Sequence, residues 1–455
     1  MNGMLSVHRV RETRKTPAPK WIAAAILSMV TLKKKLARTL IAAAAAAAAL
    51  LILAPQQAQA VPAFARQTGQ NCVACHAGGQ FPELTPYGRL FKLTGYTIGE
   101  RALPLSMMGV VTATKQKVND PALGKTQDGS LIFNTGSLFI AGKISDQIGG
   151  FAQITYNNYD SQDPNTGAWA GHSGSDNLDI RYADHLIDNN RDLIYGFTLN
   201  NNPGVQDVFN SSPAWGYGVV PGSTGPGNGV TPILDNALGA QAAGIGAYVY
   251  WNKMVYAEVT GYKTGDGMFS FMTQGNGGQV YLKGTNPYAR LALTKEWGPQ
   301  NVMVGLTHFD VHQYEADPSS PFDHYIDNGI DAQYQYLLDP YTLTAMVTRI
   351  HETIDYGTGN PSDTVNSLRA KASFTYQAKY GATLSYFNMT NTLAQESRGW
   401  TPEVFWTPIQ NVRLGLQYTM FTKNDGVTDP RDPTGASFLS AKDTNTLFFY
   451  VWAAY

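Results

Sequence analysis

Two cysteines and a histidine form a motif with an evident chemistry. Cys72 and Cys75 are the only cysteines among the 455 residues, and His76 follows the second of them directly. The C-x-x-C-H spacing is typical of a site at which haem c is attached. The two sulfurs would bond covalently to the edge of the haem, and the imidazole would ligate the iron. The motif therefore predicts one covalent haem c, with Cys72, Cys75 and His76 as its binding residues.

Other interpretations explain less of this motif. A thioredoxin-like redox pair would be expected within a βαβ pattern, and none follows the cysteines. A zinc site would need a second pair of Cys or His ligands at a usable spacing. A disulfide between Cys72 and Cys75 would leave His76 without a role. Haem attachment is the interpretation that uses all three side chains.

An export signal is predicted ahead of the motif. Basic residues precede an apolar run over residues 40–54, and Ala58-Gln59-Ala60 follows as an A-x-A cleavage site. We expect residues 1–60 to act as a cleaved signal peptide, in which 1–28 are an upstream extension ahead of a start at Met29. The apolar run is short for a membrane anchor. Export would place the cysteines outside the cytoplasm, where bacteria attach haem c.

The chain that remains after cleavage is acidic. Residues 1–60 hold nine of the 33 Lys and Arg and one of the 34 Asp and Glu, so 24 basic and 33 acidic residues remain, with a net charge of −9. An acidic protein binds nucleic acid poorly, and we expect no nucleic-acid partner. The full chain also has 45 Gly and 25 Tyr but only 15% charged residues. This composition is unusual for a soluble domain.

Residues 104–455 alternate apolar and polar side chains in stretches of about ten residues. In 367–377, the even positions from Leu368 to Tyr376 are mostly apolar, and the odd positions are polar. The stretches 411–421 and 287–297 show the same alternation. A two-residue period sends one set of side chains to lipid and the other to a polar lumen in a membrane β-barrel.

Short turns and long loops alternate between these stretches, and the long loops, which include 201–236, are expected outside the cell. Counting gives about sixteen strands, and the last one, 447–455, is rich in aromatic residues. A soluble β-sandwich or β-helix would share the period but not the rhythm of the loops. We predict an all-β fold: an outer-membrane β-barrel of about sixteen antiparallel strands (104–455), preceded by a small haem segment (61–103).

The haem segment resembles the N-terminus of a known family. Residues 63–97 are similar to the start of the fused monohaem cytochrome–porins of the outer membrane, which include bacterial iron oxidases. The matching residues are Phe64-Ala-Arg-Gln-Thr-Gly69, the haem motif, Pro82, Leu84, Gly88-Arg89, Phe91-Lys92 and Gly95-Tyr96-Thr97. The resemblance implies electron transfer across the outer membrane, with extracellular Fe(II) as donor and a periplasmic c-type cytochrome or similar carrier as acceptor. That would be an Fe(II):cytochrome c oxidoreductase type of activity.

The second axial ligand of the iron has two candidates in the sequence. Met108 lies at the start of the first expected strand, and parity turns it toward the lumen. His185 shares a strand face with Asp179 near a short turn. Methionine would raise the haem potential above that of bis-histidine ligation. Both residues could also serve only to pack or line the lumen, and the sequence leaves the choice open.

Histidines and acidic residues also map to the expected external loops and strand ends. They are His172, His308, His312, His324, His351, Asp160, Asp163, Glu315, Asp317, Asp323, Glu352, Asp355, Asp425, Asp429 and Asp432. Imidazole and carboxylate ligands suit Fe(II). Solvated loops have the same composition, so each residue alone is a weak signal.

Two functions are compatible with these features. An electron from outside must cross an apolar band about 25 Å tall, which a haem hanging in the periplasm could not bridge. Residues 61–103 are too few to bury a core of their own, so we expect them to plug the lumen from the periplasmic end. The chain would then conduct electrons through the outer membrane. The alternative is a solute porin in which a haem-bearing plug gates or senses.

Overall fold

The computed structural model describes residues 62–79, 82–188, 191–211, 220, 222–225, 231–235, 238–274, 279–392 and 395–455. The predicted signal peptide, residues 1–60, lies outside the described residues. Within the described ranges, no helix has the length and apolar character needed to cross a membrane.

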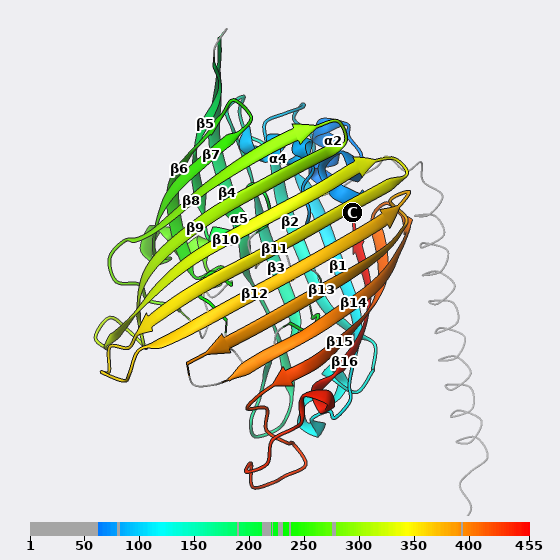
Figure 1. Ribbon diagram of the computed structural model, residues 1–455, viewed down its shortest axis with the longest axis vertical. Helices are drawn as coiled ribbons and strands as arrows, with labels where there is room; N and C mark the ends of the chain where they lie inside the picture. The colour runs from blue at the N-terminus through cyan, green and yellow to red at the C-terminus, as the bar shows by residue number, and fades with distance from the viewer. Residues whose placement is uncertain are drawn as a thin grey trace, which may run out of the picture. The chain divides into compact units, whose positions relative to one another are not determined.

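In the described part of the chain, sixteen antiparallel strands form a closed barrel, which confirms the predicted all-β class and strand number (Figure 1). The strands are β1 (Leu105–Gln116), β2 (Ile132–Lys143), β3 (Ile148–Gln162), β4 (Trp169–Asp188), β5 (Arg191–Asn200), β6 (Ala242–Trp251), β7 (Val255–Thr264), β8 (Asn286–Trp297), β9 (Gln300–Tyr314), β10 (Phe322–Leu338), β11 (Tyr341–Asp355), β12 (Asp363–Tyr376), β13 (Tyr380–Asn391), β14 (Glu396–Ile409), β15 (Val412–Asn424) and β16 (Thr446–Ala454). Each strand pairs with its neighbours in sequence, and β1 closes the sheet on β16. Closure pairs the two strands that would otherwise be edges.

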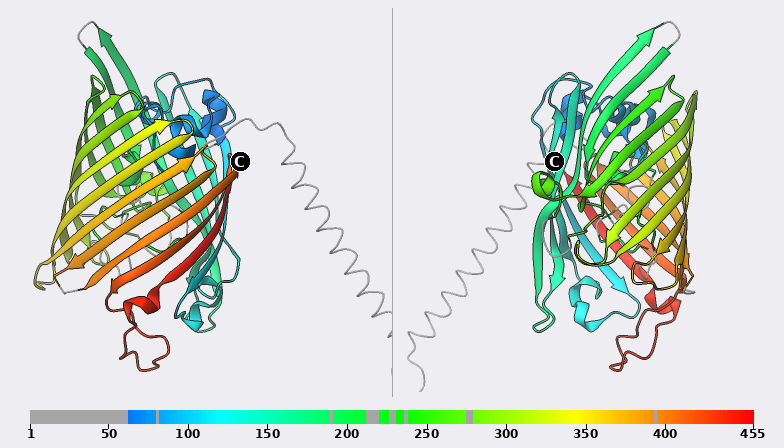
Figure 2. Two further views of the ribbon diagram at one scale, coloured as in Figure 1. Left: turned by 45° about the vertical axis from the view of Figure 1, so that its right-hand side comes forward. Right: turned by 90° about the vertical axis from the view of Figure 1, so that its left-hand side faces the viewer.

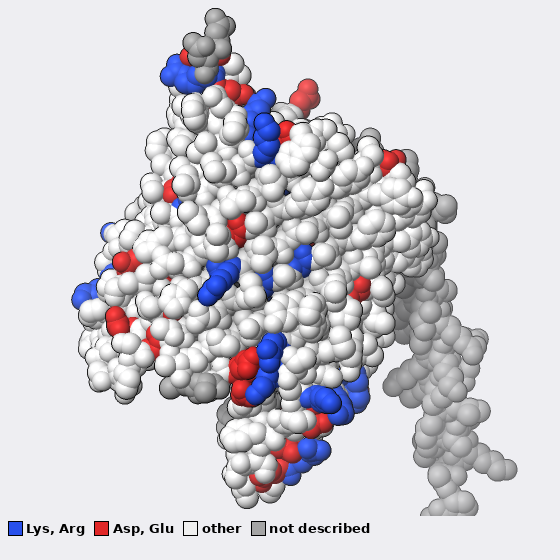
Figure 3. Space-filling view, in the orientation of Figure 1, with Lys and Arg blue, Asp and Glu red and all other residues white. Residues whose placement is uncertain are grey.

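The two faces of the wall differ as the alternation predicts. On β12, the side chains of Leu368 and Phe374 are exposed on the outside, whereas Arg369 and Lys371 are buried in the lumen. Charged side chains are sparse on the wall and gather toward its ends (Figure 3). Exposed aromatic residues that mark the ends of strands include Trp251, Trp297, Tyr341, Tyr376, Tyr380 and Trp406. An apolar outer band flanked by aromatic side chains is the pattern of transmembrane barrels.

The connections alternate in length around the barrel. One end, which we call the short-turn end, carries brief turns such as 145–147, 298–299 and 377–379. The other, the long-loop end, carries the longer connections, with 3-10 helices η2 (Pro121–Thr126), η3 (Gly267–Met272) and η4 (Ala441–Thr444). The rhythm agrees with the prediction from the sequence.

One long connection does not extend outside as predicted. The connection between β5 and β6 (residues 201–241), whose described residues we call the inner loop, turns into the lumen at α5 (Pro203–Gln206), and the residues from α5 to 211 are buried. Ser211 Oγ lies 2.7 Å from Asp331 of β10, and the amide of Leu234 donates to Asp327 at 2.8 Å. Lumenal carboxylates thus hold the loop inside, because they satisfy groups that would otherwise seek water.

The N-terminal segment, residues 62–104, is helical and lies at the short-turn end (Figures 1 and 2). It consists of α2 (Pro62–Thr68), α3 (Cys72–Cys75), η1 (Ala77–Gly79) and α4 (Pro86–Leu93). Its small core is aromatic: the Phe64 ring lies 4.9 Å from that of Phe91 and 5.3 Å from that of Tyr96, centroid to centroid. A segment of this size needs further burial against another surface, which the lumen provides.

Candidate functional site

The C-x-x-C-H motif forms one helical turn and its end. Cys72 is buried and Cys75 is half-buried. His76 leaves the helix with an extended backbone, while its amide donates to the Cys72 carbonyl at 2.8 Å. The turn places both sulfurs and the imidazole on one short piece of chain, as attachment to a single haem edge requires.

Helix α4 holds this turn in place. The amide of Thr85 donates to the Cys75 carbonyl at 2.9 Å, and the Thr85 hydroxyl caps α4 by accepting from the Gly88 amide at 3.1 Å. Pro86 at the first helical position suits this N-terminus. A Cβ on Gly88 would lie 2.2 Å from the Cys75 carbonyl oxygen, so only glycine permits this approach of the two helices.

The donor set of the motif fits haem c. Burial lowers the pKa of His76 to about 4, so its imidazole is neutral and carries the lone pair that ligates a metal. Burial raises the pKa of Cys75 to about 11, so its sulfur is a thiol. One neutral imidazole next to two cysteine sulfurs matches the groups that covalent haem attachment uses, which are two sulfurs at the haem edge and one axial nitrogen.

A polar cavity lies beside the motif, between the N-terminal segment and β12–β15. Ala77, Gly78 and Glu83 line one side of it. Charged residues of the lumen line the other side; they are Arg369, Lys371, Glu403 and Arg413. Lys371 pairs with Glu83 across the cavity at 2.6 Å, and this ion pair ties the N-terminal segment to β12.

A second attachment lies on α4. Arg89, which is 4% exposed, donates to the side-chain carbonyl oxygens of Asn301 and Gln335 at 3.0 Å each, and also to that of Gln333. Gln335 in turn donates to the Leu84 carbonyl at 3.1 Å. All three bonds come from Nη2 of Arg89, so one end of the guanidinium is shared among acceptors on β9 and β10.

The opposite side of the segment contacts the inner loop and β4. Lys92 Nζ donates to the Asp207 carbonyl at 2.7 Å and to Asn210 Oδ1 at 3.1 Å. The Tyr96 hydroxyl donates to Asp179 Oδ2 at 2.5 Å, and Asp179 also pairs with Arg181 at 2.7 Å. Contacts therefore run from β12 across β9 and β10 to β4, and they hold the segment in the mouth of the barrel.

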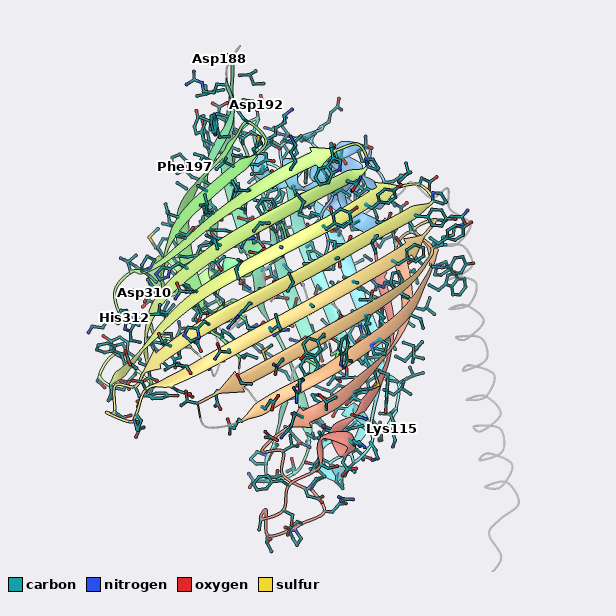
Figure 4. The ribbon with its side chains drawn as sticks, in the orientation of Figure 1. Lys115, Asp188, Asp192, Phe197, Asp310 and His312 are labelled. Carbon is teal, nitrogen blue, oxygen red and sulfur yellow. The ribbon has the colours of Figure 1, made fainter. Side chains whose placement is uncertain are left out.

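The two candidates for the second axial ligand lie in different surroundings. Met108 faces the lumen as parity predicts, but it packs near Val110 and lines a cavity with His172, distinct from the one beside Ala77. His185 lies near the tip of the β4–β5 hairpin, where its Nε2 is 2.7 Å from Asp192 Oδ1. Figure 4 shows Asp192 at this projecting hairpin. Both residues remain candidates, and no described contact joins either to His76.

The residues expected at the external end divide into two groups. His308, His312 and His324 lie on the outer face of β9 and β10 toward the long-loop end, as predicted for strand ends. Glu352 does not belong to a solvated loop: it is 1% exposed in the lumen, and its carboxylate accepts from the Ile233 amide of the inner loop at 2.6 Å. Its position near the end of β11 agrees with the prediction, and strand parity turns its side chain into the lumen.

The docking role of the charged residues was missed in the sequence. Arg89 and Lys92 belong to the matched signature, and their spacing of three places them on neighbouring positions of a helix surface. Two cationic side chains on one face of so short a helix indicate hydrogen-bond acceptors outside the segment. Glu83 offered no comparable signal, because its partner Lys371 is distant in sequence.

The chain matches no family model and no curated protein. Among solved structures it is similar to the outer membrane channel DcaP of Acinetobacter baumannii, with 13% identity over 77% of this chain and 96% of that one and a TM-score of 0.47. It is also similar to the trimeric form of OmpT, an outer membrane protein of Vibrio cholerae (11% identity, 77% and 99% covered, TM-score 0.45). A third is an anion-selective porin from Comamonas acidovorans (12% identity, 77% and 99% covered, TM-score 0.43).

Proposed function

We propose that this chain is an outer-membrane electron conduit, in which a haem c held in a barrel lumen passes electrons from extracellular Fe(II) to a periplasmic c-type cytochrome or similar carrier. The observation that carries the proposal is the position of the C-x-x-C-H motif. It lies in a segment whose charged side chains are buried against lumenal residues of the barrel. These contacts support a haem bound at the motif lying close to the lumen of the barrel.

The barrel supports a place in the outer membrane. Its backbone groups are paired around the closed sheet, and apolar side chains such as Leu306 and Val347 face outward. Only helices and closed barrels satisfy the backbone inside a bilayer. Short turns of such barrels face the periplasm, so the N-terminal segment would lie at the periplasmic mouth and the long loops outside.

Two segments of the chain occupy the lumen. The N-terminal segment lies at the short-turn end, and described residues of the inner loop contact β10 and β11. The two segments also contact each other, since Lys92 Nζ donates to the Asp207 carbonyl and Asn210 Nδ2 donates to the Pro82 carbonyl at 2.9 Å. Segments in this position would obstruct the diffusion of solutes, which favours the transfer of electrons.

Buried aromatic rings continue from the N-terminal segment toward the long-loop end. Arg181 lies between Tyr96 and Tyr248, 5.8 and 5.2 Å from the two ring centroids. The ring centroids of Tyr248 and Phe209 are 6.2 and 5.5 Å from that of Tyr256. Nearer the long loops, Tyr262, Tyr288 and Phe309 form a cluster with centroids 5.5 to 6.4 Å apart. The rings thus form two groups in the lumen, one beside the N-terminal segment and one nearer the long-loop end, and in the proposal both would lie along the path of the electron.

The residues of the motif have defined tasks in this proposal. Cys72 and Cys75 would anchor the haem, and His76 would ligate its iron. A bound haem supplies a one-electron carrier whose potential depends on its axial ligands and burial. Arg89 and Lys371 fix the segment against the wall, which keeps the distance from motif to lumen constant.

A gated solute porin is the second candidate, and the cavity beside the motif favours it. Charged lumenal residues line that cavity, as they do in channels that select ions. A plug held by few ion pairs could move. Electron transfer requires the segment to stay docked, whereas gating requires it to leave, so the two candidates predict opposite effects of weakening the contacts.

The experiment that tests the proposal combines spectroscopy and conductance on the purified full chain. We expect a covalent haem that survives denaturing extraction, and its loss in a Cys72→Ser, Cys75→Ser variant. In planar bilayers the wild-type protein should conduct ions poorly. A large stable ion conductance together with a chain that carries no covalent haem would contradict the proposal and favour the porin.

A further inference from the structure

Three potential metal ligands meet on the outer face of the barrel, away from the haem motif. They are Asp310 and His312 of β9 and His324 of β10 (Figure 4 labels the first two). His312 and His324 are directly paired across the strands, and Asp310 lies two residues from His312, so all three share one face. This rim cluster lies toward the long-loop end, where β9 and β10 approach their connecting loop.

The ligand atoms of the rim cluster converge. Asp310 Oδ1 lies 2.9 Å from His324 Nε2 and 3.5 Å from His312 Nδ1. One ligand atom from each residue falls within 4.8 Å of the others. The two imidazole rings are stacked, with centroids 4.1 Å apart and planes 14° apart.

These distances suit one ion. Nitrogen and oxygen ligands about 2.1 Å from a metal lie about 3.0 Å apart at right angles and about 3.4 Å apart at the tetrahedral angle. The two measured separations from Asp310 bracket this range. The ligand atoms of the two histidines lie within 4.8 Å of each other, and because the stacked rings are nearly parallel, the half-exposed side chains must rotate to direct both lone pairs at one ion.

The surroundings of the rim cluster leave the Asp310 carboxylate available to the two histidines, and they leave the site accessible to solvent. The ammonium of Lys283, a neighbouring cation, rests on the ring of Phe322, 3.6 Å from its centroid. The side chains of Asp310, His312 and His324 are 27 to 36% exposed, so water or a further ligand could complete the coordination. Another outward histidine of β9, His308, lies instead 2.9 Å from Asn328 and gathers no carboxylate.

We propose that Asp310, His312 and His324 form a binding site for a divalent first-row transition-metal ion at the long-loop end of the barrel. Two imidazoles and one carboxylate select this class of ion, because Ca²⁺ and Mg²⁺ prefer oxygen ligands alone. The same ligand set with open positions is the one that holds non-haem Fe(II). The proposal that the rim cluster binds a metal does not depend on the haem. The further statement that this metal is Fe(II) taken up for oxidation rests on the proposed function.

Calorimetric titration of the detergent-solubilised full chain tests the site. The probes are Zn²⁺, and Fe²⁺ without oxygen, with Ca²⁺ as the contrasting ion. We expect one bound transition-metal ion and no comparable response to Ca²⁺. Changes outside the first ligand shell already weaken metal sites by about 10–100-fold, so Asp310→Asn and His324→Ala should each weaken binding by at least about 100-fold.

His308→Ala is the matched control, since it removes an outward imidazole from the same strand without touching the rim cluster. It should leave the affinity unchanged, and circular dichroism should show the same strand content in all variants. Equal affinity in wild type, Asp310→Asn and His324→Ala would overturn the proposal, as would an equal loss in His308→Ala. Metal bound at the cluster without reduction of the haem by Fe²⁺ would support the site and contradict the proposed function instead.

Discussion

The ion pair between Glu83 and Lys371 is expected to hold the N-terminal segment in the lumen. The two charges are 2.6 Å apart, and their side chains are 9% and 3% exposed. Removing one partner of a buried pair costs about 3–5 kcal/mol, because the other charge stays buried without compensation. Water in the adjoining cavity would relieve part of this penalty, so we expect about 3 kcal/mol for Glu83→Gln. That energy corresponds to a roughly 150-fold larger population of the undocked segment.

Amide hydrogen exchange read by mass spectrometry measures this population directly. Peptides that cover α4 contain amides bonded within the segment, such as that of Arg89 to the Thr85 carbonyl at 2.9 Å. If these amides exchange through undocking, their rates should rise by about two orders of magnitude in Glu83→Gln. The double variant Glu83→Gln, Lys371→Met removes both charges and should recover much of the protection.

A surface pair provides the control. Lys143 and Asp146 are 2.9 Å apart in the β2–β3 turn, but the Asp146 side chain is 84% exposed. Exposed pairs contribute little, so Asp146→Asn should leave exchange in α4 unchanged. Exchange in Glu83→Gln within threefold of wild type would refute the docking role of the pair. Faster exchange in the double variant than in either single variant would refute the assignment of the effect to an unpaired charge.

Further substitutions test the other contacts of the segment by the same exchange measurement. Gly88→Ala should separate α3 from α4 and expose both, because its Cβ would lie 2.2 Å from the Cys75 carbonyl oxygen. Gly69→Ala is the contrasting variant: its Cβ would meet nothing within 4 Å, so the change should cost only about 1 kcal/mol of backbone strain at φ +64. Arg89→Lys should speed exchange about tenfold and Arg89→Met more, since the charge-assisted bonds to its acceptors contribute about 1.5–3 kcal/mol each before desolvation. Burial lowers the pKa of Lys92 from 10.5 to about 8. Between these two pH values the undocked segment therefore binds more protons than the docked one, so docking should strengthen as the pH rises. Lys92→Met should abolish this pH dependence.

The barrel could be predicted from the sequence because its two solvents impose a strict pattern. Each strand must present apolar residues to lipid and polar residues to the lumen, so residues 367–377 show the period of two without any long-range information. Loop length then sets the order and direction of the strands. The structure confirms the closed antiparallel barrel and the inward position of Met108.

The lumenal contacts could not be predicted, because each joins residues that are far apart in the sequence. The inner loop looks like any other polar connection, and its burial depends on acceptors such as Asp327 and Glu352. Parity along β11 turns the Glu352 side chain inward, but the loop residue that it accepts from is not visible in the sequence. The partners of Arg89 on β9 and β10 are likewise set by the register of the sheet.

The rim cluster could be predicted from the sequence only in part. His308, Asp310 and His312 alternate along one strand, so the sequence places them on one face. Asp310 is not among the acidic residues predicted for the external loops and strand ends. The pairing of His324 with His312 depends on the register of β9 and β10, which only the structure shows.

Reduction of the protein by external Fe(II) tests the central proposal most directly. The full chain, with its haem, would be reconstituted into closed vesicles with the long-loop end outward, and Fe²⁺ would be added outside without oxygen. Absorbance in a stopped-flow instrument should show the haem becoming reduced while the vesicles remain sealed. A haem that stays oxidised until the vesicles are opened to a reductant, or vesicles that prove freely permeable to ions, would contradict an electron conduit.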